Sequence, residues 1–432
     1  MMRKELLGRM FRTAAMIMII SMLAGACSKN NGPEKPEDNT GQTTGPGGNG
    51  SGDQGNSGNE GGSGDEGGNE GGTSGGDHGG SGDSGDQGGS GDSGDQGGSG
   101  GSGDQGDQPK PQITANSWMT AIDDDTKIAL LTIPGTHDAA TSTCSAAGKC
   151  QTLTISGQLE HGVRAFDLRP TMDDNSTLGN IYHSILDTGV SMEDAMKYFD
   201  SFLKAHPGEG IIVIMRYESE RQIFGSIAED NYKTAMKNFL WDSRIYQSRM
   251  AAFNRSMTMK DLRGKILIIS RNDLSPVSTF ETAYTQWSHS NSVGEALQIY
   301  GTGGLGRIYV QDMYSAEKNG NSSEADFLAK KKELVCKLLD ITVPFREYEQ
   351  NNWVINYCSG YAGSSFASDS YAKNAASANP AALEHIKAHT GKGFTGIVMM
   401  DYAGTDTYEV GGSTFSVSGK SLTEALIMNN FQ

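Results

Sequence analysis

The sequence predicts an α/β protein, a single distorted (β/α) barrel of the TIM type that follows a disordered Gly-rich tether. Short apolar runs alternate with amphipathic stretches over residues 113–432, as strands and helices do in α/β folds. About eight such runs occur in this length, which suits a closed barrel. The N-terminal residues differ, because long stretches of them contain no apolar side chain.

Residues 1–26 have the pattern of an export signal. Four Lys or Arg side chains precede the apolar run 14–23, and small residues follow it. The run is too short to span a membrane comfortably. The segment Leu23-Ala-Gly-Ala-Cys27 resembles a bacterial lipobox, in which the cysteine is lipidated, although Leu23 stands four residues before the cysteine instead of three. We therefore expect a lipid-anchored protein of the bacterial cell envelope, at the outer membrane or cell surface; a plain cleaved signal is the alternative.

Residues 27–112 are predicted to be a disordered acidic linker rich in Gly, Ser and Asp. Within them, the 67 residues of 41–107 hold 31 of the chain's 59 glycines and no Ala, Val, Ile, Leu, Met, Phe, Trp, Tyr or Cys. Such a segment buries too little apolar surface to offset the chain entropy that folding removes. A Gly-rich coil of this length spans on the order of 45 Å, so it would let the domain at 113–432 range away from its anchor.

The distribution of charge bears on the partners of the chain. The formal net charge is −17, but most of the excess acid lies in the linker, so residues 113–432 are only mildly acidic. Electrostatic binding of nucleic acid needs a concentrated basic face, which this composition does not supply. We expect no nucleic-acid partner, and a small molecule or a lipid headgroup remains open as the substrate.

The cysteines of the predicted domain are expected to be structural. They are Cys144, Cys150, Cys336 and Cys358. An even number in an exported protein permits disulfides, and the close pair Cys144 and Cys150 is the most favoured. The spacing of Cys336 and Cys358 does not suit a zinc site, which needs closely paired ligands on both sides.

Eight apolar runs are the predicted strands. Several are rich in β-branched residues and are flanked on both sides by polar residues, as buried parallel strands are. In chain order they are 128–133, 165–168, 180–182, 211–215, 266–269, 308–310, 354–357 and 397–400. No helix is evident between the second run and the third, so we expect the barrel to be irregular.

Four amphipathic stretches are the predicted helices, because apolar residues recur in them at three- and four-residue steps. They are 192–205, 228–240, 324–339 and 380–389. Ser191 followed by Asp194 has the spacing of a capping box at the start of the first helix. Pro380 is typical of a first helical turn and is placed at the start of the last.

Polar side chains with chemical uses follow the predicted strands. His137 and Asp138 follow the first run, Arg169 the second and His183 the third. After the later runs come Arg216 and Glu218, then Arg271, then Asp312 with Tyr314, and finally Asp401. The carboxyl ends of the strands of a (β/α) barrel meet on one face, so these side chains would converge. Any one of them alone is more often a cap or a solvated loop residue, but their repetition after every run indicates an active site.

This set of residues suits general acid–base attack on a phosphodiester. One histidine would take the proton of the attacking hydroxyl, the other would protonate the leaving oxygen, and an arginine would neutralise the phosphate. Asp138 and Asp401 are available to orient the two histidines. An arginine in place of a divalent cation would make the reaction insensitive to chelators. A serine nucleophile is disfavoured because no Gly-x-Ser-x-Gly lies beside a strand, and a cysteine nucleophile because no cysteine is well placed.

Five segments of the domain resemble the bacterial phosphatidylinositol-specific phospholipase C family, whose catalytic domain is of the X-domain type. The segments are 132–138 (TIPGTHD), 164–170 (RAFDLRP), 181–183 (IYH), 264–271 (GKILIISR) and 310–314 (VQDMY). The resemblance covers most of 113–432, with the motifs in order. It implies a distorted (β/α) barrel and a phosphatidylinositol diacylglycerol-lyase that needs no metal and no cofactor. In that reaction the inositol 2-hydroxyl attacks phosphorus and releases diacylglycerol and inositol 1,2-cyclic phosphate.

The resemblance also implies roles for the catalytic residues. His137 is similar to the general base of the family, with Asp401 as its partner. His183 is similar to the general acid, supported by Asp138. Arg169 resembles the phosphate-binding arginine that stands where eukaryotic relatives bind calcium.

The resemblance further implies a binding set for the inositol. Arg271 and Asp312 look like ligands of the inositol hydroxyls, and Tyr314 looks like the aromatic side chain that lies against the ring. Arg216 stands where the family has a lysine ligand. The implied substrate is phosphatidylinositol or a glycosylphosphatidylinositol at a membrane surface, and we expect a monomer.

Two other functions remain open from the sequence. One is a glycerophosphodiesterase-like enzyme on the same barrel, which would hold a divalent cation with Glu and Asp and would depend on added metal. The other is a surface lipoprotein that binds an inositol phosphate or a glycan without catalysis. The presence of both His137 and His183 together with Arg169 disfavours a pure binder, which needs neither a base nor an acid.

Overall fold

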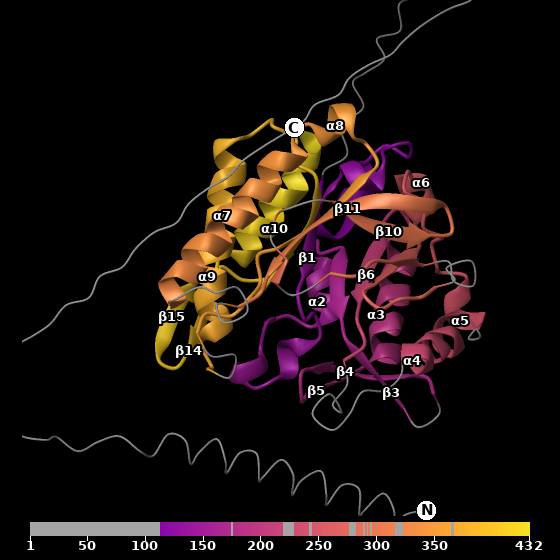
Figure 1. Cartoon of the computed structure of the whole chain (residues 1–432), viewed down its shortest axis with the longest axis horizontal. Coiled ribbons are helices and arrows are strands. Elements are labelled where there is room, and N and C mark those ends of the chain that lie inside the picture. The colour runs from indigo at the N-terminus through magenta and orange to yellow at the C-terminus, as the bar shows by residue number, and fades with distance from the viewer. Residues whose placement is uncertain are drawn as a thin grey trace, which may run out of the picture. The chain divides into compact units, whose positions relative to one another are not determined.

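The computed structural model of the chain describes residues 113–432 except 174–175, 219–228, 242–243, 276–281, 288–289, 292, 294–295, 316–322 and 364–366. The predictions made for residues 1–26, for Cys27 and for the linker at 27–112 fall outside the described residues. Figure 1 shows the arrangement of the helices and strands.

A closed barrel of nine strands confirms the predicted fold. Around the ring they are β1 (Thr132–Thr136), β2 (Ala165–Leu168), β6 (Ile211–Met215), β7 (Ile266–Ser270), β8 (Ala283–Tyr284), β10 (Leu297–Gly301), β11 (Gly304–Met313), β12 (Asn352–Tyr357) and β13 (Gly396–Met400). Neighbours are parallel except at β10, which runs antiparallel to both β8 and β11. A further short strand, β9 (Ser290–Asn291), pairs antiparallel with the end of β11.

The first predicted strand begins later than the sequence indicated. Ile128–Leu130 forms a 3₁₀ turn, closed by the Leu131 amide donating to the Ile128 carbonyl, and β1 starts at Thr132. Ile128 and Ala129 of the turn still enter the core, which is why the run looked like a strand. Pairing then begins at Thr132, opposite Gly396 of β13.

The third predicted strand is not part of the barrel. It lies in β4 (Leu178–His183), the centre of a separate sheet with β3 (Pro170–Met172) and β5 (Leu186–Ser191). Buried and accessible side chains mix along β4, whereas β6 and β7 are buried throughout. A one-sided antiparallel sheet needs no crossover helix, which explains why the sequence showed none before it.

The longer helices cover the barrel. They are α3 (Met192–Ala205), α4 (Glu229–Met236), α7 (Glu324–Thr342), α9 (Ser370–Ala388) and α10 (Gly419–Met428). The predicted capping box is confirmed, since the Ser191 hydroxyl accepts from the Asp194 amide and the Asp194 carboxylate accepts from the Ser191 amide. Helices α7, α9 and α10 lie side by side (Figure 1).

Two helix predictions are corrected. The stretch after α4 continues as the π-helix Lys237–Trp241. Pro380 lies inside α9 and not at its start, so the helix spans about twice the predicted length. A proline inside a helix removes one backbone hydrogen bond, but ten buried side chains along α9 keep it packed on the barrel on both sides of the proline.

Short elements complete the described residues. The remaining α-helices are α2 (Ile155–Glu160), α5 (Arg244–Gln247), α6 (Met259–Leu262) and α8 (Phe345–Tyr348). The remaining 3₁₀ helices are Ala115–Ala121, Thr141–Thr143, Ala146–Gly148 and Asn429–Phe431. A hairpin is formed by β14 (Thr407–Val410) and β15 (Ser413–Ser416). Among the described helices, none has the length and apolar character needed to cross a bilayer.

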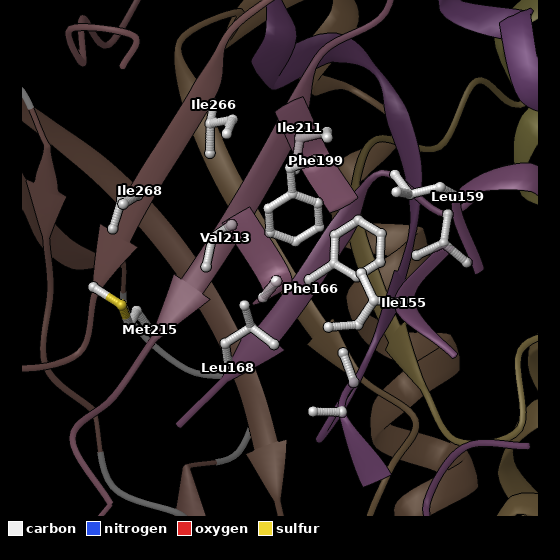
Figure 2. Close-up of a cluster of buried hydrophobic side chains, with 14 of the residues drawn as sticks. Ile155, Leu159, Phe166, Leu168, Phe199, Ile211, Val213, Met215, Ile266 and Ile268 are labelled. Carbon is white, nitrogen blue, oxygen red and sulfur yellow. The ribbon is translucent and has the colours of Figure 1, made fainter. Parts of the chain in front are cut away.

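Alternate side chains of each barrel strand enter two different cores. Ile212 and Ile214 of β6 belong to the cluster inside the barrel. Ile211 and Val213 belong to the cluster between the barrel and its helices, where Phe199 of α3 packs (Figure 2). Because both faces of the strands are buried, the polar side chains of these strands are concentrated at the strand ends.

Candidate active site

The site lies at the carboxyl ends of the barrel strands. His137 follows β1, Arg169 follows β2 and Asp401 follows β13. Thr136 is paired with Met400, so the next residues on the two strands, His137 and Asp401, lie opposite each other. His183 reaches the same place from β4 of the separate sheet.

His137 and Asp401 form a buried pair. His137 Nδ1 lies 2.9 Å from Asp401 Oδ1. Burial, and then the charge of Arg169, lowers the pKa of His137 well below its ordinary value. Burial also raises the pKa of Asp401 well above its ordinary value. One proton held between Nδ1 and Oδ1 leaves Nε2 with its lone pair, the form that a general base needs.

Asp138 is the centre of the site. Its Oδ2 lies 3.2 Å from His137 Nε2 and 3.4 Å from His183 Nε2, and its Oδ1 lies 3.1 Å from Arg169 Nε. Burial raises the pKa of this carboxyl although Arg169 opposes the shift. The two histidines and the arginine are thus directed at one small anionic group.

Arg169 is held between two carboxylates. Its Nη2 lies 2.9 Å from Asp167 Oδ2, in addition to the contact of its Nε with Asp138. Burial disfavours the charged guanidinium, but Asp138 and Asp167 outweigh burial and raise the pKa of Arg169 well above its ordinary value. Burial likewise opposes ionisation of Asp167, yet Arg169 holds the pKa of that carboxyl below its ordinary value. Arg169 is a fixed positive charge in the site.

His183 is oriented by contacts that the sequence did not reveal. Its Nδ1 donates to the Gly148 carbonyl at 2.9 Å, and its Nε2 lies 3.1 Å from the hydroxyl of Tyr371. Tyr371 comes from the first turn of α9, 188 positions away in the chain. No pattern near residue 371 distinguishes this tyrosine from other helical core residues.

A second group of predicted residues lies on the other side of the site. Arg271 Nη2 is 3.4 Å from Asp312 Oδ2, and the Trp287 ring nitrogen donates to the same oxygen at 2.9 Å. The Arg271 guanidinium lies over the Trp287 ring at 4.1 Å. Tyr314 packs beside the catalytic pair, with its ring centroid 6.1 Å from that of His137. Trp287 is an addition to the predicted set.

Arg216 follows β6 and pairs with Glu218. Both charges act on the groups around Arg169: Arg216 contributes to the lowered pKa of Asp167, after the larger effect of Arg169, and Glu218 contributes to the raised pKa of Arg169. Arg216 is thus paired with Glu218, two residues further along the chain.

The backbone at or after Asp138, His183 and Asp401 adopts an uncommon conformation. Asp138 itself has φ of 42°, Ser184 after His183 has φ of 56°, and Tyr402 after Asp401 has φ of 58°. Non-glycine residues rarely occupy this left-handed region, and where they do the surrounding structure has to hold them. The three turns direct the side chains inward at the ends of their strands.

Thr141 and Gln151 hold the loop that follows β1. The Thr141 hydroxyl donates to the Asp138 carbonyl at 2.7 Å and accepts from the Cys150 amide at 3.1 Å. The Gln151 side-chain amide donates to the carbonyls of His137 and Met400, both at 2.9 Å. Sequence reasoning missed both residues, because their partners are backbone atoms.

Lys331 is a further buried charge near the site. From α7 its Nζ donates to Gln311 Oε1 at 3.2 Å and to the Met313 carbonyl at 2.9 Å. Burial lowers the pKa of Lys331 to about 8, with Asp312 acting in the opposite direction. A lysine among the apolar positions of a predicted helix was a signal that the sequence offered and that the prediction did not use.

The predicted disulfide is wrong, since Cys144 and Cys150 are free thiols. Cys144 ends a short 3₁₀ turn, whereas Cys150 packs among the tyrosines Tyr361, Tyr371 and Tyr402. The remaining two cysteines of the domain are free as well.

The position of the Cys150 thiol also differs from the prediction that no cysteine lies near the site. A thiol sulfur of Cys150, a ring nitrogen of His137 and a carboxylate oxygen of Asp138 lie within 4.8 Å of one another. The sequence prediction of no well-placed cysteine therefore needs correction: Cys150 lies against the catalytic pair.

The chain is similar to known proteins of one family. A family model described as phosphatidylinositol-specific phospholipase C, X domain, matches residues 132–272. A 1-phosphatidylinositol phosphodiesterase of Listeria monocytogenes is 34% identical over 170 residues, which are 38% of this chain and 51% of the relative. The chain thus spans about half the length of that relative. A protein of the same name from Staphylococcus aureus strain Newman is 26% identical over 303 residues, covering 67% of this chain and 88% of the relative.

Solved structures share the fold. A phosphatidylinositol-specific phospholipase C from Staphylococcus aureus superposes with a TM-score of 0.57 at 23% identity, covering 73% of this chain and 97% of that one. A structure of a single-residue variant of the Staphylococcus aureus protein gives the same TM-score of 0.57 at 24% identity, covering 73% of this chain and 96% of that one. The distorted barrel is therefore the fold of these proteins as well.

Proposed function

We propose, on the match of residues 132–272 to the X-domain family of phosphatidylinositol-specific phospholipases C, that this chain belongs to that family and cleaves phosphatidylinositol. The products are diacylglycerol and inositol 1,2-cyclic phosphate. The observation that carries the proposal is the convergence of His137, His183 and Arg169 on one carboxylate, that of Asp138. A phosphodiester is also an anion, and its cleavage needs a base, an acid and a positive charge close to the phosphorus.

His137 acts as the general base. Its lowered pKa keeps the imidazole neutral at pH 7, and the contact with Asp401 fixes the proton on Nδ1. Nε2 then takes the proton of the inositol 2-hydroxyl while that oxygen attacks phosphorus. Asp401 stabilises the imidazolium that forms.

His183 acts as the general acid and Arg169 binds the phosphate. His183 donates its Nε2 proton to the leaving oxygen of diacylglycerol, while Nδ1 stays bonded to the Gly148 carbonyl. The guanidinium of Arg169 neutralises the non-bridging phosphate oxygens as charge develops on them. A fixed guanidinium in this position supplies the positive charge for which other phosphotransfer enzymes use a divalent cation.

Arg271, Asp312 and Tyr314 are proposed to bind the inositol. A guanidinium and a carboxylate side by side offer both donors and acceptors to adjacent hydroxyls. Tyr314 presents a ring face beside the catalytic pair, against which the inositol ring packs. All of these groups come from one chain, so the proposed activity does not require a residue from a second copy.

Phosphorus NMR of the full chain with phosphatidylinositol in detergent micelles tests the proposal. We expect a cyclic inositol phosphate signal that persists in EDTA. Product only after addition of a divalent cation would instead favour the metal-dependent glycerophosphodiesterase-like function. No product under either condition would contradict the proposed activity.

We also propose that Cys27 carries a lipid that anchors the chain in the bacterial cell envelope, at the outer membrane or cell surface. The support is the signal-like pattern of residues 1–26 and the small residues before Cys27. Metabolic labelling with a fatty acid should label the wild type and fail to label Cys27→Ala. Equal labelling of both would contradict the anchor.

A further inference from the structure

Three possible metal-ligand atoms lie close together in the site. His137 Nε2 and Asp138 Oδ2 are buried and make no hydrogen bond among the described residues. They lie 3.2 Å apart, and the two residues are only 1% and 3% exposed. Cys150, which is fully buried, completes a group of ligand atoms within 4.8 Å of one another.

We propose that His137, Asp138 and Cys150 form an inhibitory site for a thiophilic divalent cation such as Zn²⁺. The set of one imidazole, one carboxylate and one thiolate matches the ligands that zinc takes in proteins. Three protein ligands leave a fourth tetrahedral position for water. Hard cations such as Ca²⁺ and Mg²⁺ need more oxygen ligands than these residues supply.

The three ligands are held in place before any cation binds. Thr141 links two of them, because its hydroxyl bonds both the Asp138 carbonyl and the Cys150 amide. The Cys150 carbonyl is fixed as well, since it accepts from the Tyr402 amide at 2.8 Å. Gln151 holds the carbonyl of His137. A site organised in this way loses little conformational freedom when it binds.

Asp401 prepares His137 as a metal ligand. The 2.9 Å contact between Asp401 Oδ1 and His137 Nδ1 is the carboxylate–histidine arrangement that orients ligating imidazoles. It places the proton on Nδ1 and leaves the lone pair on Nε2, which lies 3.2 Å from Asp138 Oδ2. The same preparation that makes His137 a base therefore makes it a ligand.

The charges around the site are compatible with a cation. Arg169 binds Asp138 through Oδ1, so Oδ2 remains on the side of His137. Arg169 repels a dication, but the carboxylates of Asp167 beside Arg169 and Asp401 beside His137 oppose that repulsion. On binding, the S–H bond of Cys150 breaks, a sulfur–metal bond forms, and the proton passes to solvent.

Occupancy of this site would stop the proposed reaction. A cation bound to His137 Nε2 takes the lone pair that accepts the inositol proton, and it draws Asp138 away from His183. The inhibitory effect rests on the proposed function, whereas binding of the cation does not. The two claims are therefore measured separately.

Co²⁺ absorption tests binding without reference to activity. The probe is the full chain titrated with Co²⁺ after treatment with EDTA, with Cys27→Ser in every sample so that its thiol does not contribute. We expect a near-ultraviolet thiolate-to-cobalt band in this background, displaced by Zn²⁺ and not by Ca²⁺ or Mg²⁺. Cys150→Ser should lose the band. The matched controls Cys144→Ser and Cys358→Ser, two buried free cysteines outside the proposed ligand set, should keep it.

A band that persists in Cys150→Ser, or that disappears in Cys144→Ser, overturns the proposal. If circular dichroism shows that Cys150→Ser does not fold, Asp138→Asn is used instead. It removes one ligand and should weaken Co²⁺ binding by at least about tenfold. Unchanged affinity in Asp138→Asn overturns the proposal too.

Zn²⁺ inhibition tests the effect on the reaction. The Zn²⁺ concentration that halves phosphatidylinositol cleavage should rise at least about tenfold in Cys150→Ser, each protein being compared with its own rate in EDTA. It should be unchanged in Cys358→Ser. A cobalt band without cleavage under any condition supports the metal site and contradicts the proposed function. Cleavage in EDTA without a cobalt band overturns the metal site alone.

Discussion

Asp138 is the side chain that ties the site together. Because it contacts both histidines and Arg169, the proposed base, the proposed acid and the proposed phosphate ligand share one partner. Replacement of any of them leaves the others packed around the same carboxylate. Single substitutions in this group should therefore change the chemistry more than the fold.

Substitution of either histidine should abolish most of the activity. His137→Ala removes the proton acceptor and His183→Ala the proton donor, and each loss should lower kcat by about 10²- to 10⁴-fold. The measurement is phosphatidylinositol turnover, with circular dichroism to verify the fold. His161→Ala, at an exposed histidine, serves as the control and should retain full turnover. Turnover near the wild-type rate in either active-site variant would refute the role given to that histidine.

The pH dependence of kcat/KM should report His137. Because burial and Arg169 lower the pKa of this imidazole, it remains neutral at about pH 6.5, the ordinary histidine value, and the acid limb of kcat/KM should lie below that pH. An acid limb above about pH 6.5 would show that another group limits the reaction.

Substitution of Lys331 tests whether nearby positive charge lowers the pKa of His137. The positive charge of Lys331 also lowers the pKa of His137, and with a pKa of about 8 it is charged where His137 titrates. Lys331→Met should therefore move the acid limb of kcat/KM to higher pH. The exposed neighbour Lys332→Met should leave the limb in place. An identical acid limb in both variants would contradict the electrostatic argument.

At the scale of elements, the site depends on where three strands end and on what packs against their ends. Helix α10 begins at Gly419, which lies against the backbone of Tyr402, the residue after Asp401. A side chain added there would meet the Tyr402 carbonyl oxygen at 2.0 Å. The backbone of Tyr402 cannot move aside as the end of a flexible side chain can. The close packing of Gly419 against Tyr402 therefore holds the neighbouring Asp401 in position.

Gly419→Ala should accordingly cost stability and activity together. The clash should destabilise the fold by about 1–3 kcal/mol and displace Asp401 from His137, lowering kcat. Denaturant unfolding and turnover measure the two effects. In Gly157→Ala, inside α2, the added carbon meets no atom closer than 3.3 Å, and that variant should be close to neutral. A Gly419→Ala protein with wild-type stability would show that α10 shifts freely.

The elements also show where sequence reasoning stops. The capping box at Ser191 and the buried run of β6 depend on neighbours in the chain, and both were predicted correctly. The 3₁₀ turn at Ile128–Leu130 and the place of β4 outside the barrel were not. An apolar run shows that its side chains are buried, but it does not show which sheet, or which turn, buries them.

At the scale of the whole molecule, the sequence divides into residues that can form a core and residues that cannot. The segment 41–107 offers no apolar side chain to any core. Each proposed catalytic residue, in contrast, lies between 137 and 401, within the part of the chain that the structure describes. The chemistry should therefore be independent of the segment.

Deletion of residues 41–107 should leave turnover of a soluble inositol phosphodiester unchanged. The segment contributes no group to the proposed site, and its expected role is to separate the domain from an anchor. The measurement compares kcat and KM of the deleted and the complete chain on the same soluble substrate. A large loss of turnover in the deleted chain would show that the segment is more than a spacer.

The sequence by itself determined the local properties of this protein: the buried runs, the capped helix, and the order of polar residues that follow the strands. These depend on residues close together in the chain. The tertiary structure alone decided which distant residues meet. Closure of the barrel pairs β1 with β13, so that His137 meets Asp401 across 264 positions. Packing of α9 brings Tyr371 to His183, and the same packing places the free thiol of Cys150 beside the catalytic pair. Contacts of this kind follow from strand register and helix packing, which no short stretch of sequence encodes.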